Sequence, residues 1–160
     1  MNEAIIVSDS SPLHYLILIK AVDLLPSLAR EILIPPTVER ELTNDATPIL
    51  VREWIASPPE WLRILTPQNP FESFGLDAGE AEAIALATEL KIGPILIDER
   101  KGFRVAKACG LEPIGILAIL EVCAAKRQID FDEYISRLLA TNFRLHDRLI
   151  RDARQRLQRS

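Results

Sequence analysis

Two aspartates stand where predicted strands of this sequence end. Asp9 comes one residue after the apolar run 4–7, and Asp98 directly follows the apolar run 95–97. In an open α/β sheet, ligands bind at the carboxyl ends of the strands, so side chains placed there are the first candidates for chemistry. Both aspartates are therefore expected at one rim of the sheet.

Three glutamates are expected near the same rim. Glu41 lies in the first two turns of a helix that follows the apolar run 32–34, and Glu80 and Glu82 stand in the first turns of the helix before Asp98. A helix turns about 100° per residue, so Glu80 and Glu82 need not point the same way. We favour Glu80 as the site residue because it shares a face with Ile84, which is expected to face the sheet.

These acids together predict a cation site. Carboxylates packed side by side repel each other unless a cation neutralises them. Oxygen ligands without histidine or cysteine favour Mg²⁺ or Mn²⁺ over Zn²⁺. Such an ion can activate water and stabilise the charge on a phosphoryl group, so the expected chemistry is that of a phosphate ester.

Each acid alone also has a purely structural interpretation. Asp9 could be a turn residue at a strand end, and Glu41 could belong to a solvated helix face. Glu80 could complete a capping box with Asp77, and Asp98 could cap the helix that follows it. Taken singly, none of these signals is specific, so the ordered set carries the prediction.

A group of basic residues follows Asp98. Arg100, Lys101 and Arg104 come within six positions of it, and Arg100 and Arg104 share one helix face. The functional interpretation is attraction of a phosphate backbone beside the metal site. The alternative is a solvated helix face without a ligand.

The composition is typical of a soluble globular protein of one domain, with 160 residues, 48% of them hydrophobic and 26% charged. The apolar runs, such as 16–19, are too short for a bilayer, and the N-terminus lacks a signal-peptide pattern, so a cytoplasmic location is expected. Cys109 and Cys123 do not make a disulfide framework. His14 and His146 lie far apart, which gives a catalytic triad little support.

The charge is unevenly distributed. The net charge is -4, which argues against a nucleic-acid binder, but residues 144–159 contain six arginines and two aspartates and carry +4. The remaining residues therefore hold an acidic excess, and the predicted metal site accounts for part of it.

Strands that alternate with helices predict an α/β fold, in three α/β/α layers around a short parallel central sheet. Ser11 before Pro12 is expected to cap the first helix. No repeat or linker interrupts the chain, so residues 1–160 are expected to form one domain, with 131–160 as a helical extension. The expected strands are 4–7, 32–34, 63–65, 95–97 and a short one near 113–114. The expected helices are 12–20, one around 24–28, 35–42, 47–57, 81–91, 99–109, 116–127, 131–140 and 143–158.

Four segments of the sequence resemble the acidic motifs of PIN domains. Residues 6–13 (IVSDSSPL), 34–42 (IPPTVEREL), 79–87 (GEAEAIALA) and 95–102 (ILIDERKG) resemble the first to fourth motifs in order. The similarity runs from about residue 4 to 125. It is closest to a PIN-like subfamily of small prokaryotic proteins, where it extends into the C-terminal helices.

The resemblance implies a metal-dependent ribonuclease that uses Mg²⁺ or Mn²⁺ and is often the toxin of a VapBC-type toxin–antitoxin pair. Carried over, Asp9, Glu41, Glu80 and Asp98 are the catalytic acids, with Asp9, Asp98 and Glu80 or Glu82 as metal ligands. Two departures stand out. The third acid is usually Asp but is Glu here, and Leu96 stands where Ser or Thr commonly precedes the fourth acid.

The resemblance also gives expectations for partners. RNA is the expected substrate, bound by Ser11, Arg100, Lys101 and Arg104. A small antitoxin protein and a second copy of the chain are expected partners. The homodimer is also suggested by the apolar content of the C-terminal helices, which include Phe131, Tyr134, Leu138, Leu139, Phe143, Leu145, Leu149 and Ile150.

Two other functions remain open. One is a PIN-like binding or regulatory protein with weak or no nuclease activity, which the altered third acid and the acidic pI favour. The other is a small-molecule protein similar to response-regulator receivers, which also place carboxylates at strand ends. That second alternative lacks a suitable lysine after a late strand, since 113–114 is followed by Gly115.

Overall fold

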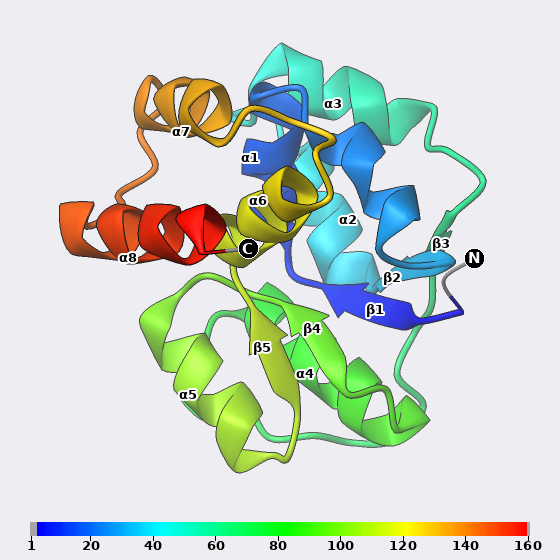
Figure 1. Cartoon of the computed structure of the whole chain (residues 1–160). Coiled ribbons are helices and arrows are strands. Elements are labelled where there is room, and N and C mark those ends of the chain that lie inside the picture. Colours follow the sequence, from blue (N-terminus) through cyan, green and yellow to red (C-terminus); the bar gives the residue numbers. More distant parts are fainter. Residues whose placement is uncertain (1–2, 160) are drawn as a thin grey trace.

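A five-stranded, entirely parallel sheet lies at the centre of the computed structural model, which describes residues 3–159 (Figure 1). The strands are β1 (Ile5–Ser8), β2 (Glu31–Ile34), β3 (Leu62–Ile64), β4 (Pro94–Leu96) and β5 (Glu112–Ile114). Their order is β3-β2-β1-β4-β5, so the chain starts in the middle, builds one half and then returns to build the other. The strand order therefore reverses between β1 and β4, where α/β sheets usually bind ligands.

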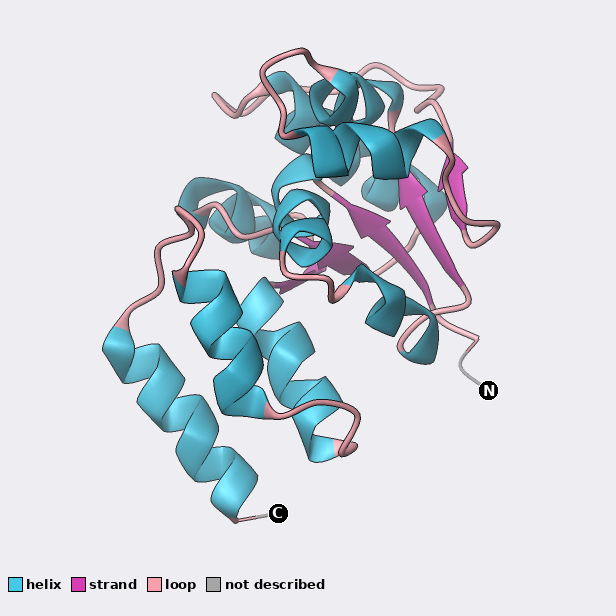
Figure 2. Ribbon diagram, turned by 90° about the horizontal axis from the view of Figure 1, so that it is seen from above, coloured by secondary structure: helices cyan, strands magenta, loops and turns pink. Residues whose placement is uncertain are grey.

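Helices cover both faces of the sheet (Figure 2). They are α1 (Ser10–Leu18), the 3-10 helix η1 (Val22–Ser27), α2 (Pro36–Thr43), α3 (Ile49–Ala56), α4 (Ala78–Leu90), α5 (Arg100–Ala108), α6 (Ile116–Ala125), α7 (Phe131–Leu139) and α8 (Asp147–Gln158). Helices α4 and α5 cover one face, and the others gather on the opposite face (Figure 1). The predicted three-layer α/β/α fold is thus confirmed.

The strands contribute alternate residues to two cores. Ile6 and Ile32 belong to the larger core under α1, α3 and α6, whereas Val7 and Leu33 belong to the core under α4 and α5. Successive side chains of a strand point to opposite faces, and both faces of this sheet are covered. That double burial explains why the strands appear in the sequence as unbroken apolar runs.

The first helix starts earlier than predicted. Asp9, and not Ser11, is the N-cap of α1, and the helix begins at Ser10. The backbone N–H of Asp9 donates to the Leu96 carbonyl (3.0 Å), so Asp9 is still fixed to the sheet when the helix begins. Pro12 is tolerated because the first N–H groups of a helix have no partner within the helix.

The segment 143–146 was predicted to be helical but precedes α8 as non-helical chain. The Thr141 hydroxyl accepts the Phe143 N–H (3.1 Å), and this local turn competes with helix formation. The C-terminal apolar residues mostly pack within the chain, with Phe131, Leu138 and Ile150 buried. They therefore account for much of the apolar content from which a dimer was expected.

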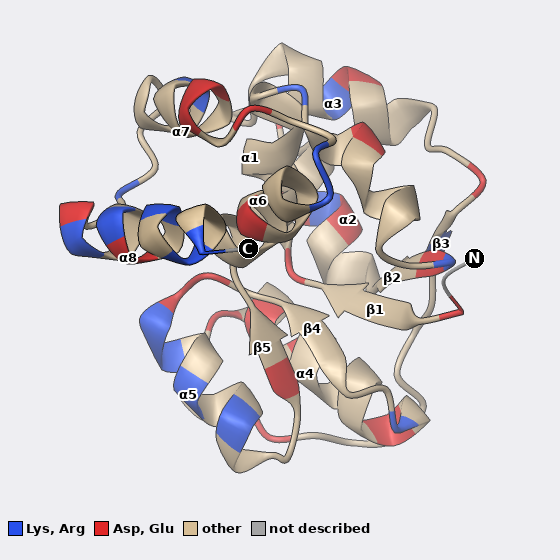
Figure 3. Cartoon of the chain, in the orientation of Figure 1, with Lys and Arg blue, Asp and Glu red and all other residues tan. Residues whose placement is uncertain are grey.

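No helix within residues 3–159 combines the length and apolar character needed to cross a membrane. Arginines recur along α8 (Figure 3), and some of them stabilise the fold. Arg154 pairs with Asp132 (2.8 Å), and Arg156 pairs with Glu121 (2.6 Å). The basic tail thus partly holds α8 against α6 and α7.

Candidate functional site

Asp9 and Asp98 lie at the same edge of the sheet, on neighbouring strands. β1 and β4 pair through Val7 with Ile95 and Ser8 with Leu96. Asp9 comes directly after β1, and Asp98 comes two residues after the last residue of β4. Parallel strands end at a common rim, and the pairing register brings the two aspartates to it together.

Three carboxylates converge beside β1. One carboxylate oxygen each from Asp9, Glu41 and Asp77 lies within 4.8 Å of the others. Asp9 is only 4% exposed. Asp77 caps α4 by accepting the Glu80 N–H (2.8 Å), as the capping motif predicted, and its carboxylate also belongs to this cluster.

The two glutamates of α4 have different surroundings. Glu80 is buried (5% exposed), and the charges of Asp77 and Asp9 act on it. Glu82 is half-buried and accepts a 2.6 Å hydrogen bond from the Thr37 hydroxyl at the start of α2. Glu80 thus lies toward the acidic cluster, and Glu82 ties α4 to α2.

Asp98 is directed toward another helix than the one expected. Its carboxylate accepts the Ile116 N–H (3.2 Å) at the start of α6, whereas Glu99 occupies the N-cap position of α5. The reason is the parallel pairing of β4 with β5, which brings the start of α6 next to the end of β4. Asp98 remains close enough to Asp9 for its charge to raise the pKa of Asp9.

Burial and mutual repulsion hold these acids toward their protonated forms. Burial, together with the charges of Asp77, Glu41 and Asp98, raises the pKa of Asp9 to about 7. Burial likewise raises the pKa of Asp98 to about 6, although the hydrogen bond from the Ile116 N–H acts in the opposite direction and lowers this pKa. The pKa values of Glu41 and Glu80 are also raised, first by burial and then through Asp77, which acts on Glu41 by its charge and on Glu80 by a hydrogen bond and its charge.

The cluster has the features of a cation site. Within the described residues, Asp9 Oδ1, Glu41 Oε1 and Glu80 Oε2 are buried oxygens without a hydrogen-bond partner. Buried acceptors are normally paired, and unpaired ones are costly. A divalent cation would satisfy these oxygens and remove the repulsion between the acids, and an all-oxygen set suits Mg²⁺ or Mn²⁺. The residues present therefore fit such an ion.

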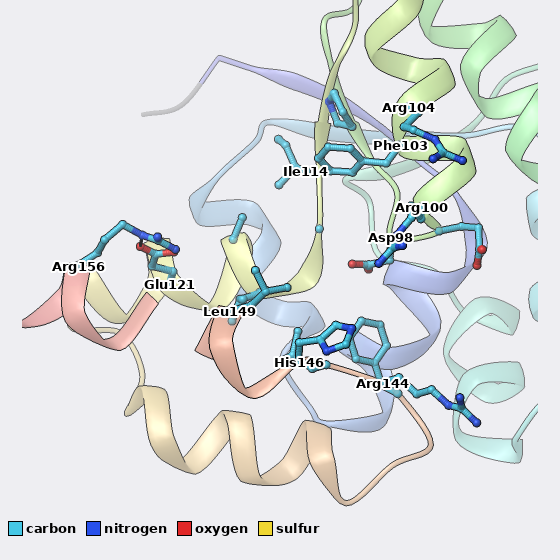
Figure 4. A pocket seen from close by; sticks show the side chains of 17 residues that line it. Asp98, Arg100, Phe103, Arg104, Ile114, Glu121, Arg144, His146, Leu149 and Arg156 are labelled. Carbon is cyan, nitrogen blue, oxygen red and sulfur yellow. Dashed lines mark hydrogen bonds and ion pairs between the residues drawn. The ribbon is translucent and has the colours of Figure 1, made fainter. Parts of the chain in front are cut away.

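The basic residues predicted to bind RNA have different positions. Arg100 and Arg104 are exposed on α5 and line a groove next to Asp98 (Figure 4). Lys101 donates to the Gly75 carbonyl (3.0 Å) and so holds the loop that leads into α4. Ser11 lies half-buried in the first turn of α1.

The sequence did not point to Asp77 as a member of the acidic cluster. Its position as N-cap of α4 explained it structurally, and no pattern marks a capping aspartate as a ligand. The signal that could have found it is the predicted convergence itself, because the start of α4 had to lie at the same rim as Glu80. Arg144 and His146, which line the same groove as Asp98, were not among the predicted site residues either.

Comparison with known proteins gives one family match. The family model DUF3368, described as a PIN domain, matches residues 5–159. Among solved structures, the chain is similar to a PilT N-terminus domain protein, SSO1118, from the hyperthermophilic archaeon Sulfolobus solfataricus P2. The TM-score is 0.48 at 15% identity, covering 89% of this chain and 99% of that one. A sequence comparison with curated proteins gives no significant match.

Proposed function

The chain belongs to the PIN domain family, whose model matches residues 5–159, and from this premise we propose that it is a ribonuclease that hydrolyses RNA phosphodiester bonds with a divalent cation. PIN domains are typically metal-dependent nucleases, and the acidic cluster is compatible with that activity. The observation that carries the proposal is the convergence of the Asp9, Glu41 and Asp77 carboxylates, in which Asp9 and Glu41 each have a buried oxygen without a hydrogen-bond partner.

Four acids would hold the cation. Asp9, Glu41 and Asp77 would supply the oxygens that already lie together, and Glu80 would supply its unpaired Oε2. Asp98 lies beside them, with its orientation fixed by the Ile116 N–H. Glu82 is assigned a structural part, because the Thr37 hydroxyl already holds it.

The chemistry follows from the site's charge. When bound, Mg²⁺ or Mn²⁺ supplies a Lewis acid that activates water for attack on phosphorus and stabilises the charge on the phosphate. The raised pKa of Asp9 means that this acid holds its proton more tightly without a cation and must release it when a cation binds. Arg100, at the start of α5 beside Asp98, would bind a neighbouring phosphate of the RNA.

For the biological setting, we propose a toxin of a toxin–antitoxin pair that acts in the cytoplasm as one domain over residues 1–160. A small antitoxin protein and a second copy of the chain would be its partners. The motif resemblance supports the antitoxin, and Leu139, which remains exposed on α7, is compatible with a dimer contact.

The test is metal-dependent cleavage with matched variants. Purified protein is incubated with structured and unstructured RNA, with Mn²⁺ or with EDTA, beside Asp9→Asn and the surface control Asp45→Asn. Cleavage should require Mn²⁺, vanish in Asp9→Asn and persist in Asp45→Asn. A calorimetric Mn²⁺ titration is run on the same samples. Wild-type protein that neither binds Mn²⁺ nor cleaves RNA would reject the nuclease proposal and favour the alternative, a metal-free binding protein.

A further inference from the structure

A groove of about 870 Å³ opens next to the acidic cluster, and its lining includes Asp98, which lies beside that cluster. It lies where α5, β5 and α6 meet the segment 143–149, which leads into α8 (Figure 4). Parts of the chain distant in sequence thus build its two walls. The groove therefore reaches the edge of the proposed catalytic site at Asp98.

The rim of the groove carries unneutralised positive charge. Arg100 and Arg104 lie on the α5 wall, and Arg144 lies on the opposite wall (Figure 4). In the part of the chain that the structure describes, none of these three arginines forms an ion pair. Of the acids in the groove, Glu121 is paired with Arg156 (2.6 Å), which leaves Asp98 and Glu99 at the end near the cluster.

The floor between the arginines is apolar. Phe103, Ile114, Leu117 and Leu149 line it, and Leu149 is 48% exposed. The exposed imidazole of His146 stands beside them. Flat or apolar side chains bounded by cations provide a surface on which unpaired bases stack while their phosphates are bound at the rim.

The wall that carries Arg144 is fixed to the core. The Tyr15 hydroxyl of α1 donates to Asn142 Oδ1 (2.7 Å), and the Tyr15 ring contacts Phe143 edge-on, with 5.0 Å between centroids. These contacts precede Arg144 and His146 in the chain. They hold the approach to α8 over the groove, so the second wall does not depend on a ligand.

We propose that this groove holds a single-stranded segment of the RNA on one side of the phosphodiester bond that is cleaved. The proposal rests on the proposed ribonuclease function. Arg100, Arg104 and Arg144 bind backbone phosphates, and bases lie against His146, Phe103 and the apolar floor. A duplex keeps its bases stacked inside and leaves such a floor unused, so the groove selects unpaired RNA.

The test measures binding separately from cleavage. In an Asp9→Asn background, which prevents cleavage, fluorescence anisotropy follows a labelled single-stranded oligoribonucleotide of about 10 nucleotides and the same sequence in a duplex. Arg144→Gln and His146→Ala are compared with Arg151→Gln. Arg151 is exposed on α8 outside the groove, and its replacement removes the same charge as Arg144→Gln.

We expect Arg144→Gln to weaken single-strand binding about fivefold and to lower the salt dependence by about one ion. His146→Ala should weaken it by about fivefold as well, through lost stacking. Arg151→Gln should bind as the parent does, and the duplex should bind more weakly than the single strand.

The groove assignment is overturned if the groove variants bind RNA as the parent does, or if Arg151→Gln loses as much affinity as Arg144→Gln. The first result would leave the groove to a protein partner, and the second would reduce the effect to overall charge. Mn²⁺-dependent cleavage by the chain with Asp9 intact is measured in parallel. Its persistence in either case would leave the ribonuclease function standing, whereas its absence would reject that function independently of the groove.

Discussion

Replacing Asp9 with Asn should change how the stability of the metal-free protein depends on pH. Asp9 is buried among other acids, and its pKa rises from 3.8 to about 7 in the folded protein. The folded protein therefore binds this proton more tightly than the unfolded chain does. The stabilisation from that proton is fully present below pH 3.8 and is lost as the pH rises through about 7.

The size of the effect follows from the shift. Raising the pKa of Asp9 from 3.8 to about 7 corresponds to about 4 kcal/mol of unfolding free energy. Between about pH 5 and about pH 8, roughly 2 to 3 kcal/mol of it should be lost. The side chain that Asp9→Asn introduces cannot ionise. The loss of stability between these pH values should therefore be smaller in the variant than in the wild-type protein, by the same roughly 2 to 3 kcal/mol.

The assay is urea unfolding in EDTA at both pH values, for the wild-type protein, Asp9→Asn and the surface control Asp45→Asn. Mn²⁺ should restore much of the wild-type stability at the higher pH by binding the folded state, and should do little for Asp9→Asn. Equal pH dependence of wild type and Asp9→Asn would refute the argument, because Asp9 would then titrate alike in the folded and unfolded chains.

Three further variants test parts of the site. Glu80→Gln should abolish Mn²⁺-dependent stabilisation and cleavage, whereas Glu82→Gln should keep most of both. If a Mn²⁺ titration shows that Glu82→Gln loses Mn²⁺ binding and Glu80→Gln keeps it, Glu82 is the metal ligand and Glu80 has the structural role. Gly79→Ala should weaken Mn²⁺ binding by about tenfold or more, because a Cβ there would overlap the Glu41 carboxylate; an unchanged calorimetric affinity would contradict this. Lys101→Met should speed limited proteolysis of the loop before α4, because the Lys101 ammonium holds that loop. If the variant instead loses only RNA affinity, Lys101 contacts the RNA backbone, as predicted from the sequence.

The fold could be predicted from the sequence because both faces of the sheet are buried, so that its strands appear as unbroken apolar runs. The runs 4–7, 32–34 and 95–97 each match a strand within about two residues at either end. The predicted helix over 143–146 was wrong because its apolar spacing is helical, while the Thr141 hydroxyl makes a local turn that spacing does not reveal. The segment of η1 was predicted simply as a helix around 24–28, and its 3-10 form was not predicted. Pro26 lies within it and removes one backbone hydrogen-bond donor.

The position of the acids could be predicted, but their orientation could not. Strand-end placement brought Asp9 and Asp98 to one rim, and helical rotation separated Glu80 from Glu82. The direction of Asp98 toward Ile116 depends on which strand lies next to β4, and that is a property of the sheet order. Asp77 was missed for a related reason, since one carboxylate both caps α4 and joins the cluster.

Glycines provide the space for these carboxylates. A Cβ at Gly79 would overlap Glu41, one at Gly102 would overlap Glu80, and one at Gly115 would lie 2.7 Å from Asp98 Oδ1. Gly79 and Gly102 lie in the first turns of α4 and α5, and Gly115 is the N-cap of α6. Helix N-termini favour negative charge, so a carboxylate that lies close to one is stabilised electrostatically. The glycines leave room for this because no side chain stands between the carboxylate and the helix.

This arrangement explains how the fold tolerates the cluster. The α4, α5 and α6 N-termini partly offset repulsion among the acids, and the glycines let the carboxylates approach those N-termini closely. The compensation is incomplete, because three buried oxygens in the described chain still lack hydrogen-bond partners. A cation at the proposed site would remove this remaining cost, so the same unfavourable charge that lowers the stability of the metal-free fold would drive metal binding.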